Sequence, residues 1–245
     1  TLNEKMDGNL IEEARRWRQL ADHMGLPQNS EGIYEQHDGF FTLPRLDIHA
    51  IPMEEFPLYH HWSYDRIYRT DMIKQPDVLM MQFLYSGDFD KESKRVNYDY
   101  YEPKCIHESS LSPSVHSILA AEIGKEEEAY HFFGFATRLD LDNYNRNTHE
   151  GLHTTSIAAA WMNIVYGFGG MRSDGGHLLF NPTIPAPWKS YRFAIRYQGA
   201  LIRVHVTKEQ VTFQKASGDD VVMDLYGKTY VLKDEALRFN AKVVQ

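Results

Sequence analysis

The chain has little cysteine and no long apolar run. Its 245 residues include one cysteine, Cys105, which excludes an internal disulfide framework. No apolar segment approaches the roughly twenty residues needed to cross a bilayer, and the N-terminus does not resemble a signal peptide. We therefore expect a cytoplasmic protein with no membrane partner.

Basic patches and the common nucleotide-binding loops are also missing. The net charge is −8, and the lysines and arginines are scattered along the chain, whereas nucleic-acid binding needs them clustered. Neither Gly-x-x-x-x-Gly-Lys-Ser/Thr nor Gly-x-Gly-x-x-Gly occurs, and a serine nucleophile would lack its elbow motif. These absences argue against nucleic acid as a partner and against the usual nucleotide chemistry.

Histidine is plentiful, but its pattern does not predict a metal site. The chain has twelve histidines, including the adjacent His60 and His61. Neighbouring side chains on a strand point to opposite faces, so this pair would not bind one ion together. We expect no metal and no organic cofactor.

Apolar residues at helical spacing dominate the first two thirds of the chain. They predict about six helices, and a long proline- and aromatic-rich loop separates the first helix from the others. Six helices would form roughly half of a twelve-helix (α/α)6 toroid, which would leave apolar surface bare. The expected helices are Asn9–Met24, Asp77–Tyr85, Lys91–Tyr101, Pro113–Glu122, Glu126–Arg138 and Thr155–Tyr166.

After Gly169-Gly170 the apolar pattern changes from helical to alternating. Residues 191–232 read as short strands separated by turn signals such as Gln198-Gly199. The expected fold class is therefore mainly α with a C-terminal β domain, a partial toroid followed by a small antiparallel β-sandwich. We place the domains at residues 1–172 and 173–245.

The polar run from Gly151 to Ser156 precedes an apolar helix. Hydroxyls and the His153 imidazole would lie where the first N–H groups of that helix point outward, so an anion would meet hydrogen-bond donors and the positive end of the helix dipole. The alternative is that Thr154 or Thr155 is a simple N-cap. Taken alone, the run leaves both interpretations open.

Two further polar segments precede predicted helices. One contains Lys74 and Gln75, and Pro76 biases Gln75 towards extended backbone at a helix entrance. Lys74 could bind an anion or a sugar hydroxyl there, or it could be an ordinary surface lysine. The other segment is Tyr100–Ser110, rich in aromatic and polar residues. If the three helix entrances share one rim, they would line a single pocket.

Several longer motifs together resemble glycoside hydrolase family 65, the family of maltose, kojibiose, nigerose and trehalose phosphorylases. The resemblance implies an (α/α)6 catalytic barrel followed by a β-sandwich. It also implies inverting phosphorolysis of an α-glucosidic disaccharide to β-glucose 1-phosphate, with inorganic phosphate as co-substrate and a homodimer as the full-length form. The motifs are Ile73–Val78, Tyr101-Glu102-Pro103, His107–Ser117, Gly151–Ser156, Gly167–Arg172 and Phe180-Asn181-Pro182 with Trp188.

The resemblance assigns roles to five residues. His153, Thr155 and Ser156 would hold phosphate, with Thr154 the less certain member of that run, while Lys74 and Gln75 would contact the glucosyl unit. A phosphate dianion is already nucleophilic, so the catalytic base of an inverting hydrolase is not needed.

The family's general acid has no matching position in this sequence. That glutamate lies in a segment expected upstream of Thr1, and Glu35 and Glu108 are interpreted as positioning or structural groups. The chain is therefore expected to be the C-terminal portion of a longer enzyme and to be inactive alone.

The leading functional prediction is a disaccharide phosphorylase of the maltose phosphorylase type. The alternatives are an inverting hydrolase of the same architecture, or a non-catalytic module that binds sugar, phosphate or another polypeptide. The disaccharide linkage stays open.

Overall fold

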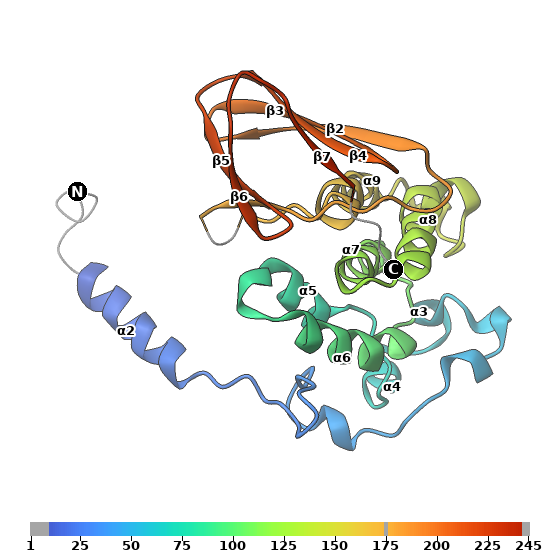
Figure 1. Cartoon of the computed structure of the whole chain (residues 1–245). Helices are drawn as coiled ribbons and strands as arrows, with labels where there is room; N and C mark the ends of the chain where they lie inside the picture. The colour runs from blue at the N-terminus through green and yellow to red at the C-terminus, as the bar shows by residue number, and fades with distance from the viewer. Residues whose placement is uncertain (1–9, 174–175, 242–245) are drawn as a thin grey trace.

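The computed structural model describes residues 10–173 and 176–241, with helices first and strands after them (Figure 1). The first described helix, α2 (Leu10–His23), extends away from the rest of the molecule, and none of its residues is buried. Its apolar stripe is as predicted, and Trp17 and Leu20 are each more than half exposed. No helix in these described ranges is both long and apolar enough to cross a membrane.

The predicted long loop is ordered and has its own small core. Leu58, Trp62, Ile67, Met72 and Ile106 pack together there. The segment contains only short helical turns, which run from η1 to α4: η1 (Phe40–Thr42), η2 (Ile48–Ala50), η3 (Met53–Glu55), α3 (Leu58–His61) and α4 (Tyr64–Tyr68).

Five longer helices follow, close to the predicted ranges. The central one is α7, in which every residue except Glu122 is buried. Such a helix, apolar or small on all sides, must be surrounded by other elements, and α5, α6, α8 and α9 pack around it. The five are α5 (Asp77–Leu84), α6 (Lys91–Tyr101), α7 (Ser112–Ile123), α8 (Glu126–Asp142) and α9 (Thr154–Met162), with short turns η4 (Ser86–Asp88), η5 (Glu102–Lys104) and η6 (Thr148–Glu150) between them.

The last helix departs from its predicted form. Regular α geometry ends at Met162, and the chain continues as a wider π-helix, η7 (Asn163–Phe168). Gly167 lies against α7 there, since a Cβ atom at this position would be 3.4 Å from the Ile118 Cα. Close packing on α7 therefore accompanies the change in helix type.

The C-terminal region forms two small sheets, with strand orders β1-β5-β6 and β2-β3-β4-β7. All strand pairs in these sheets are antiparallel except β1 with β5, which run parallel. Phe180 of the first sheet packs against Phe193 and Phe213 of the second. The strands are β1 (Leu178–Phe180), β2 (Ser190–Tyr197), β3 (Ala200–Thr207), β4 (Gln210–Ser217), β5 (Val221–Leu225), β6 (Lys228–Leu232) and β7 (Leu237–Asn240).

One continuous core joins the helices to the sheets. The Trp188 ring packs on Phe133 of α8 and Phe168 of η7. The Tyr191 hydroxyl donates a hydrogen bond to the Phe168 carbonyl, at 2.7 Å. The β region is thus fixed against the helices that carry the candidate site.

Candidate functional site

His153 lies at the N-terminus of α9 and is held by Asp140 of α8. The Asp140 carboxylate accepts the His153 backbone N–H at 2.9 Å and lies 2.5 Å from the ring Nδ1. This arrangement places the ring proton on Nδ1 and leaves Nε2 free for another group. The hydrogen bond from His153 holds the pKa of the Asp140 carboxyl below its ordinary value, so Asp140 is ionised at neutral pH.

The hydroxyl residues after His153 divide between two environments. Thr154 and Thr155 are exposed in the first turn of α9. Ser156 is buried, and its hydroxyl donates to the Ala136 carbonyl of α8 at 2.9 Å. Successive residues on a helix point about 100° apart, so Thr155 and Ser156 do not present their side chains in the same direction.

The sequence around His153 also contains a second motif. His149-Glu150-Gly151-Leu152-His153 matches His-Glu-x-x-His, which binds zinc when both histidines share one helix face. Here the turn η6 ends at Glu150, and Gly151 has a φ of 126°. The two histidines therefore do not lie on a common helix, and His153 is instead engaged with Asp140.

Lys74 lies among aromatic rings at the entrance to α5. Its Nζ donates to the Tyr64 hydroxyl at 2.9 Å and lies 4.7 Å and 5.3 Å from the ring centres of Tyr64 and Tyr59. Such rings stabilise an ammonium group electrostatically. Lys74 and Gln75 both line a hollow of about 330 Å³ that the Asp77 carboxylate also borders.

Glu108 is a buried carboxylate, and only one of its two oxygens has a hydrogen-bond partner in the described part of the chain. Its Oε1 accepts the Leu58 backbone N–H, while Oε2 has no hydrogen-bond partner in the described part of the chain. Burial raises the pKa of Glu108, although the N–H groups of Leu58 and Tyr59 and the Lys74 charge oppose this effect. Through Oε1, Glu108 holds the backbone at the start of α3, next to Tyr59, whose ring contacts Lys74.

Glu35 has a local structural contact. Its carboxylate accepts the Phe41 backbone N–H at 3.3 Å. This bond bridges the start of η1 and closes the turn before it, in keeping with the structural role expected for Glu35.

The segment before α9 contacts Tyr59 and His60, which lie near Lys74. Asn147 donates to the Tyr59 hydroxyl at 3.1 Å, and His60 lies 3.4 Å from Glu150. Tyr59 also contacts Lys74, and Ile73 pairs with Cys105 of the Tyr100–Ser110 segment, so neighbouring contacts connect the three polar segments. Among residues 10–173 and 176–241, however, no hydrogen bond or ion pair joins Lys74 or Gln75 directly to the His153–Ser156 run.

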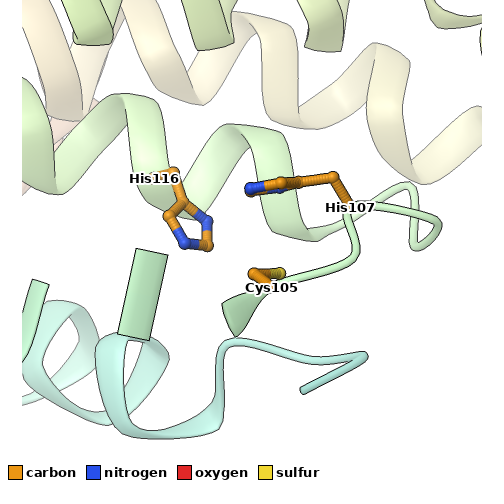
Figure 2. A group of neighbouring side chains, drawn as sticks. All are labelled: Cys105, His107 and His116. Carbon is orange, nitrogen blue, oxygen red and sulfur yellow. The ribbon is translucent and has the colours of Figure 1, made fainter. Parts of the chain in front are cut away.

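A second polar cluster, for which the sequence predicts no metal site, lies where the Tyr100–Ser110 segment meets α7. Cys105, His107 and His116 each offer a potential metal-ligand atom, and these atoms lie within 4.8 Å of one another (Figure 2). The signal in the sequence is Cys-x-His followed by a histidine nine residues further on, a spacing outside the common zinc motifs.

The described chain thus combines helices that carry polar and aromatic side chains at their N-terminal ends with a β region of two small sheets. Residues 3–162 match the model of the glycosyl hydrolase family 65 central catalytic domain, and residues 171–232 match the model of the family's C-terminal domain. The chain belongs to glycosyl hydrolase family 65.

Several similar proteins are named as disaccharide phosphorylases. The chain is 43% identical to the alpha,alpha-trehalose phosphorylase of Thermoanaerobacter brockii and to the maltose phosphorylase of Bacillus subtilis (strain 168). Both matches cover 91% of this chain, but only 29% and 30% of those relatives. The chain therefore spans less than a third of their length.

A solved structure shares the fold. It is of a protein from the human microbiome named as a candidate kojibiose phosphorylase, with a TM-score of 0.86 and 50% identity. The match covers 93% of this chain and 34% of that one.

Proposed function

We propose that this chain is the C-terminal portion of an inverting α-glucosidic disaccharide phosphorylase of the maltose phosphorylase type. The observation that supports it most is the His153–Asp140 pair beside the exposed Thr155 at the start of α9. The pair presents a fixed imidazole at a helix N-terminus, which suits a phosphate dianion. Equal identity to a maltose and a trehalose phosphorylase makes the choice of maltose part of the proposal.

In the proposed reaction, an oxygen of phosphate attacks the anomeric carbon of the glucosyl unit. A carbon–oxygen bond forms to phosphate as the glycosidic carbon–oxygen bond breaks on the opposite face, giving β-glucose 1-phosphate. His153 and Thr155 hold phosphate through their side chains. Ser156 was also predicted to hold phosphate, but its buried hydroxyl donates to the Ala136 carbonyl, so we assign it the role of fixing the first turn of α9 against α8. Lys74 and Gln75 contact the glucosyl unit.

The leaving sugar oxygen needs a proton from a general acid. We assign this acid to a glutamate in the part of the family's length that this chain does not span, so the isolated chain should not turn over disaccharides. Residues 1–172 would complete one side of the catalytic barrel, and residues 173–245 would form the β domain. A homodimer is the proposed full-length form.

The test uses the complete open reading frame that encodes this chain. Glucose 1-phosphate formation from maltose, trehalose, kojibiose and nigerose is measured with and without phosphate. We expect the full-length protein to form glucose 1-phosphate from maltose when phosphate is present and to form none when phosphate is absent. The 245-residue chain alone should not turn over any of the four disaccharides. Phosphate-independent release of glucose would instead identify a hydrolase.

Three variants test the phosphate site. His153→Ala should remove activity. Asp140→Asn should raise the KM for phosphate by about 10- to 100-fold, because an amide cannot accept both hydrogen bonds and the ring loses its fixed position. The matched control is Asp142→Asn, since Asp142 pairs with Arg138 on the same helix. Equal KM values in the Asp140 and Asp142 variants would contradict the assignment.

A further inference from the structure

The cluster of Cys105, His107 and His116 lies in the interior, at the junction of the Tyr100–Ser110 segment and α7. Cys105 is 4% exposed and His116 is fully buried. Cys105 and His107 lie on one loop and His116 lies on α7, and their side chains are neighbours (Figure 2). Polar groups placed together in a core normally have hydrogen-bond partners.

The two imidazoles each have one nitrogen without a partner. The His116 Nδ1 lies 2.7 Å from the Ser112 carbonyl, which can only accept, so Nδ1 carries the proton. The His107 Nδ1 lies 3.2 Å from the Ser112 hydroxyl, whose own proton is directed at the Ser109 carbonyl. Within the described residues, the Nε2 atoms of both histidines are buried and have no partner.

The groups around the trio favour ligation. Both rings are fixed through Nδ1 by Ser112, as ligating histidines are usually fixed by a neighbouring acceptor. Burial raises the pKa of the Cys105 thiol to about 12, while the His107 backbone N–H acts in the opposite direction. The positive charge of a bound divalent cation would stabilise the negatively charged thiolate form of Cys105 at this buried position.

We propose that Cys105, His107 and His116 form a zinc site, with the sulfur and the two unpartnered Nε2 atoms as ligands. Thiolate and imidazole are ligands for zinc, whereas magnesium and calcium require oxygen. Zinc bonds of about 2.0 Å to nitrogen and 2.3 Å to sulfur place ligand atoms roughly 3.3–3.5 Å apart. One potential ligand atom of each residue now lies within 4.8 Å of the other two, so the three residues would approach by up to about 1.5 Å, and the fourth ligand would be a water molecule.

The zinc would stabilise the neighbouring candidate site and take no part in its chemistry. Ile73 pairs with Cys105 in a parallel bridge, through hydrogen bonds of 2.8 Å to the Lys104 carbonyl and 3.0 Å from the Ile106 N–H. Lys74 follows Ile73, and Glu108 follows His107. An ion joining Cys105 and His107 to α7 would therefore fix the backbone that carries both residues.

The first experiment measures the metal content of the 245-residue chain. The chain is incubated with zinc, desalted and analysed by mass spectrometry for bound metal, and circular dichroism confirms its folding. One zinc ion per chain is expected, and magnesium or calcium should not replace it. Chelator should lower the melting temperature, and added zinc should restore it. A folded wild-type chain that retains no zinc would overturn the proposal.

The second experiment identifies the ligands. Cobalt in the wild-type site should produce a sulfur-to-cobalt charge-transfer absorption, which Cys105→Ser removes. Ser112→Ala keeps all three ligands and should weaken zinc binding by about 10- to 100-fold. The matched control is His131→Gln, an exposed histidine on α8 outside the trio, and it should behave as wild type. Cobalt absorption that survives Cys105→Ser would show that the metal binds elsewhere.

Discussion

Glu122 is the one residue of α7 that is not buried, and it has a clear energetic role because two cations converge on it. Its carboxylate lies 2.5 Å from Lys94 and 2.7 Å from Arg172, and the Lys94 side chain is only 3% exposed. Both cations also bond to Ser86. The network joins α6 and α7 to the backbone that leads into the β region, and neutralising the Glu122 carboxylate would leave two cations facing each other.

Glu122→Gln should lower the free energy of unfolding by about 3 kcal/mol at pH 7, the usual scale for breaking a buried ion pair. Urea unfolding of the two proteins measures the difference. The matched control is Glu128→Gln, since Glu128 pairs with Lys125 at the surface, and it should cost less than about 1 kcal/mol. Similar losses in both variants would mean that the network adds no stability.

The same residue predicts a pH dependence. Burial alone would raise the pKa of Glu122, but the charges of Arg172 and Lys94 outweigh it and hold the pKa below its ordinary value of 4.5. A lowered pKa in the folded state gives stability that is present above pH 4.5 and lost as the pH falls through the folded value. The stability difference between wild type and Glu122→Gln should therefore shrink below pH 4.5, and a constant difference would contradict this origin.

Among the elements, the connection between η7 and β1 has a very close backbone approach. Gly170 has a φ of 58°, and a Cβ atom there would lie 2.5 Å from the Asn181 carbonyl oxygen. The Asn181 N–H also donates to the Gly170 carbonyl at 3.2 Å. No side chain fits without moving the backbone that joins the helices to the sheets.

Gly170→Ala should destabilise the fold by about 3 kcal/mol or more, from strained backbone and overpacking together. Gly199→Ala separates the two effects. Gly199 has a φ of 84° in the β2–β3 hairpin, and a Cβ atom there would have no neighbouring atom within 4 Å, so its cost should be about 1 kcal/mol. Chemical unfolding measures the loss of unfolding free energy in each variant. Equal losses would show that the close approach to Asn181 adds nothing to the effect of the positive φ.

At the scale of the whole molecule, apolar side chains on two helices have no cover. Ile11, Trp17 and Leu20 of α2 are more than half exposed, as is Ile157 of α9. Apolar patches of this kind mark surfaces that pack on other protein. The chain covers less than a third of its relatives' length, so the exposed stripe of α2 is expected to drive association when the chain is studied alone.

The isolated chain should therefore associate increasingly as its concentration rises. Trp17→Lys combined with Leu20→Lys should weaken this association by at least about tenfold, because each large apolar side chain contributes roughly 1.5–3 kcal/mol when buried. Light scattering coupled to size-exclusion chromatography measures the molar mass of each protein at several concentrations. Gln19→Lys adds charge to the same helix outside the stripe and should have little effect. A wild-type monomer at every concentration would rule out this role for α2.

Much of the fold could be predicted because its signals are local. Lys91–Tyr101 was predicted with the bounds that α6 has, since Asp90 caps its N-terminus and the apolar residues follow helical spacing. Gly124 ends α7 in the left-handed conformation. Alternation likewise located β2 to β6. In each case a few neighbouring residues determine the backbone conformation.

The candidate site was predictable only in part. Lys74 and His153 are both at helix entrances as expected, but the sequence did not reveal that Asp140 fixes His153 or that Ser156 faces α8. It also gave no usable signal for the Cys105 cluster. Those relations depend on how separate segments, such as α8 and α9, pack together.

The sequence by itself determined where most of the longer helices and strands lie, because capping residues, glycines and apolar periodicity act over a few positions. Only the tertiary structure decided the π-helical end of α9, the parallel pairing of β1 with β5, the Lys94–Glu122–Arg172 network and the meeting of Cys105 with His116. These features arise where separate elements come into contact. Close packing, not local preference, fixes the backbone and the side-chain directions there.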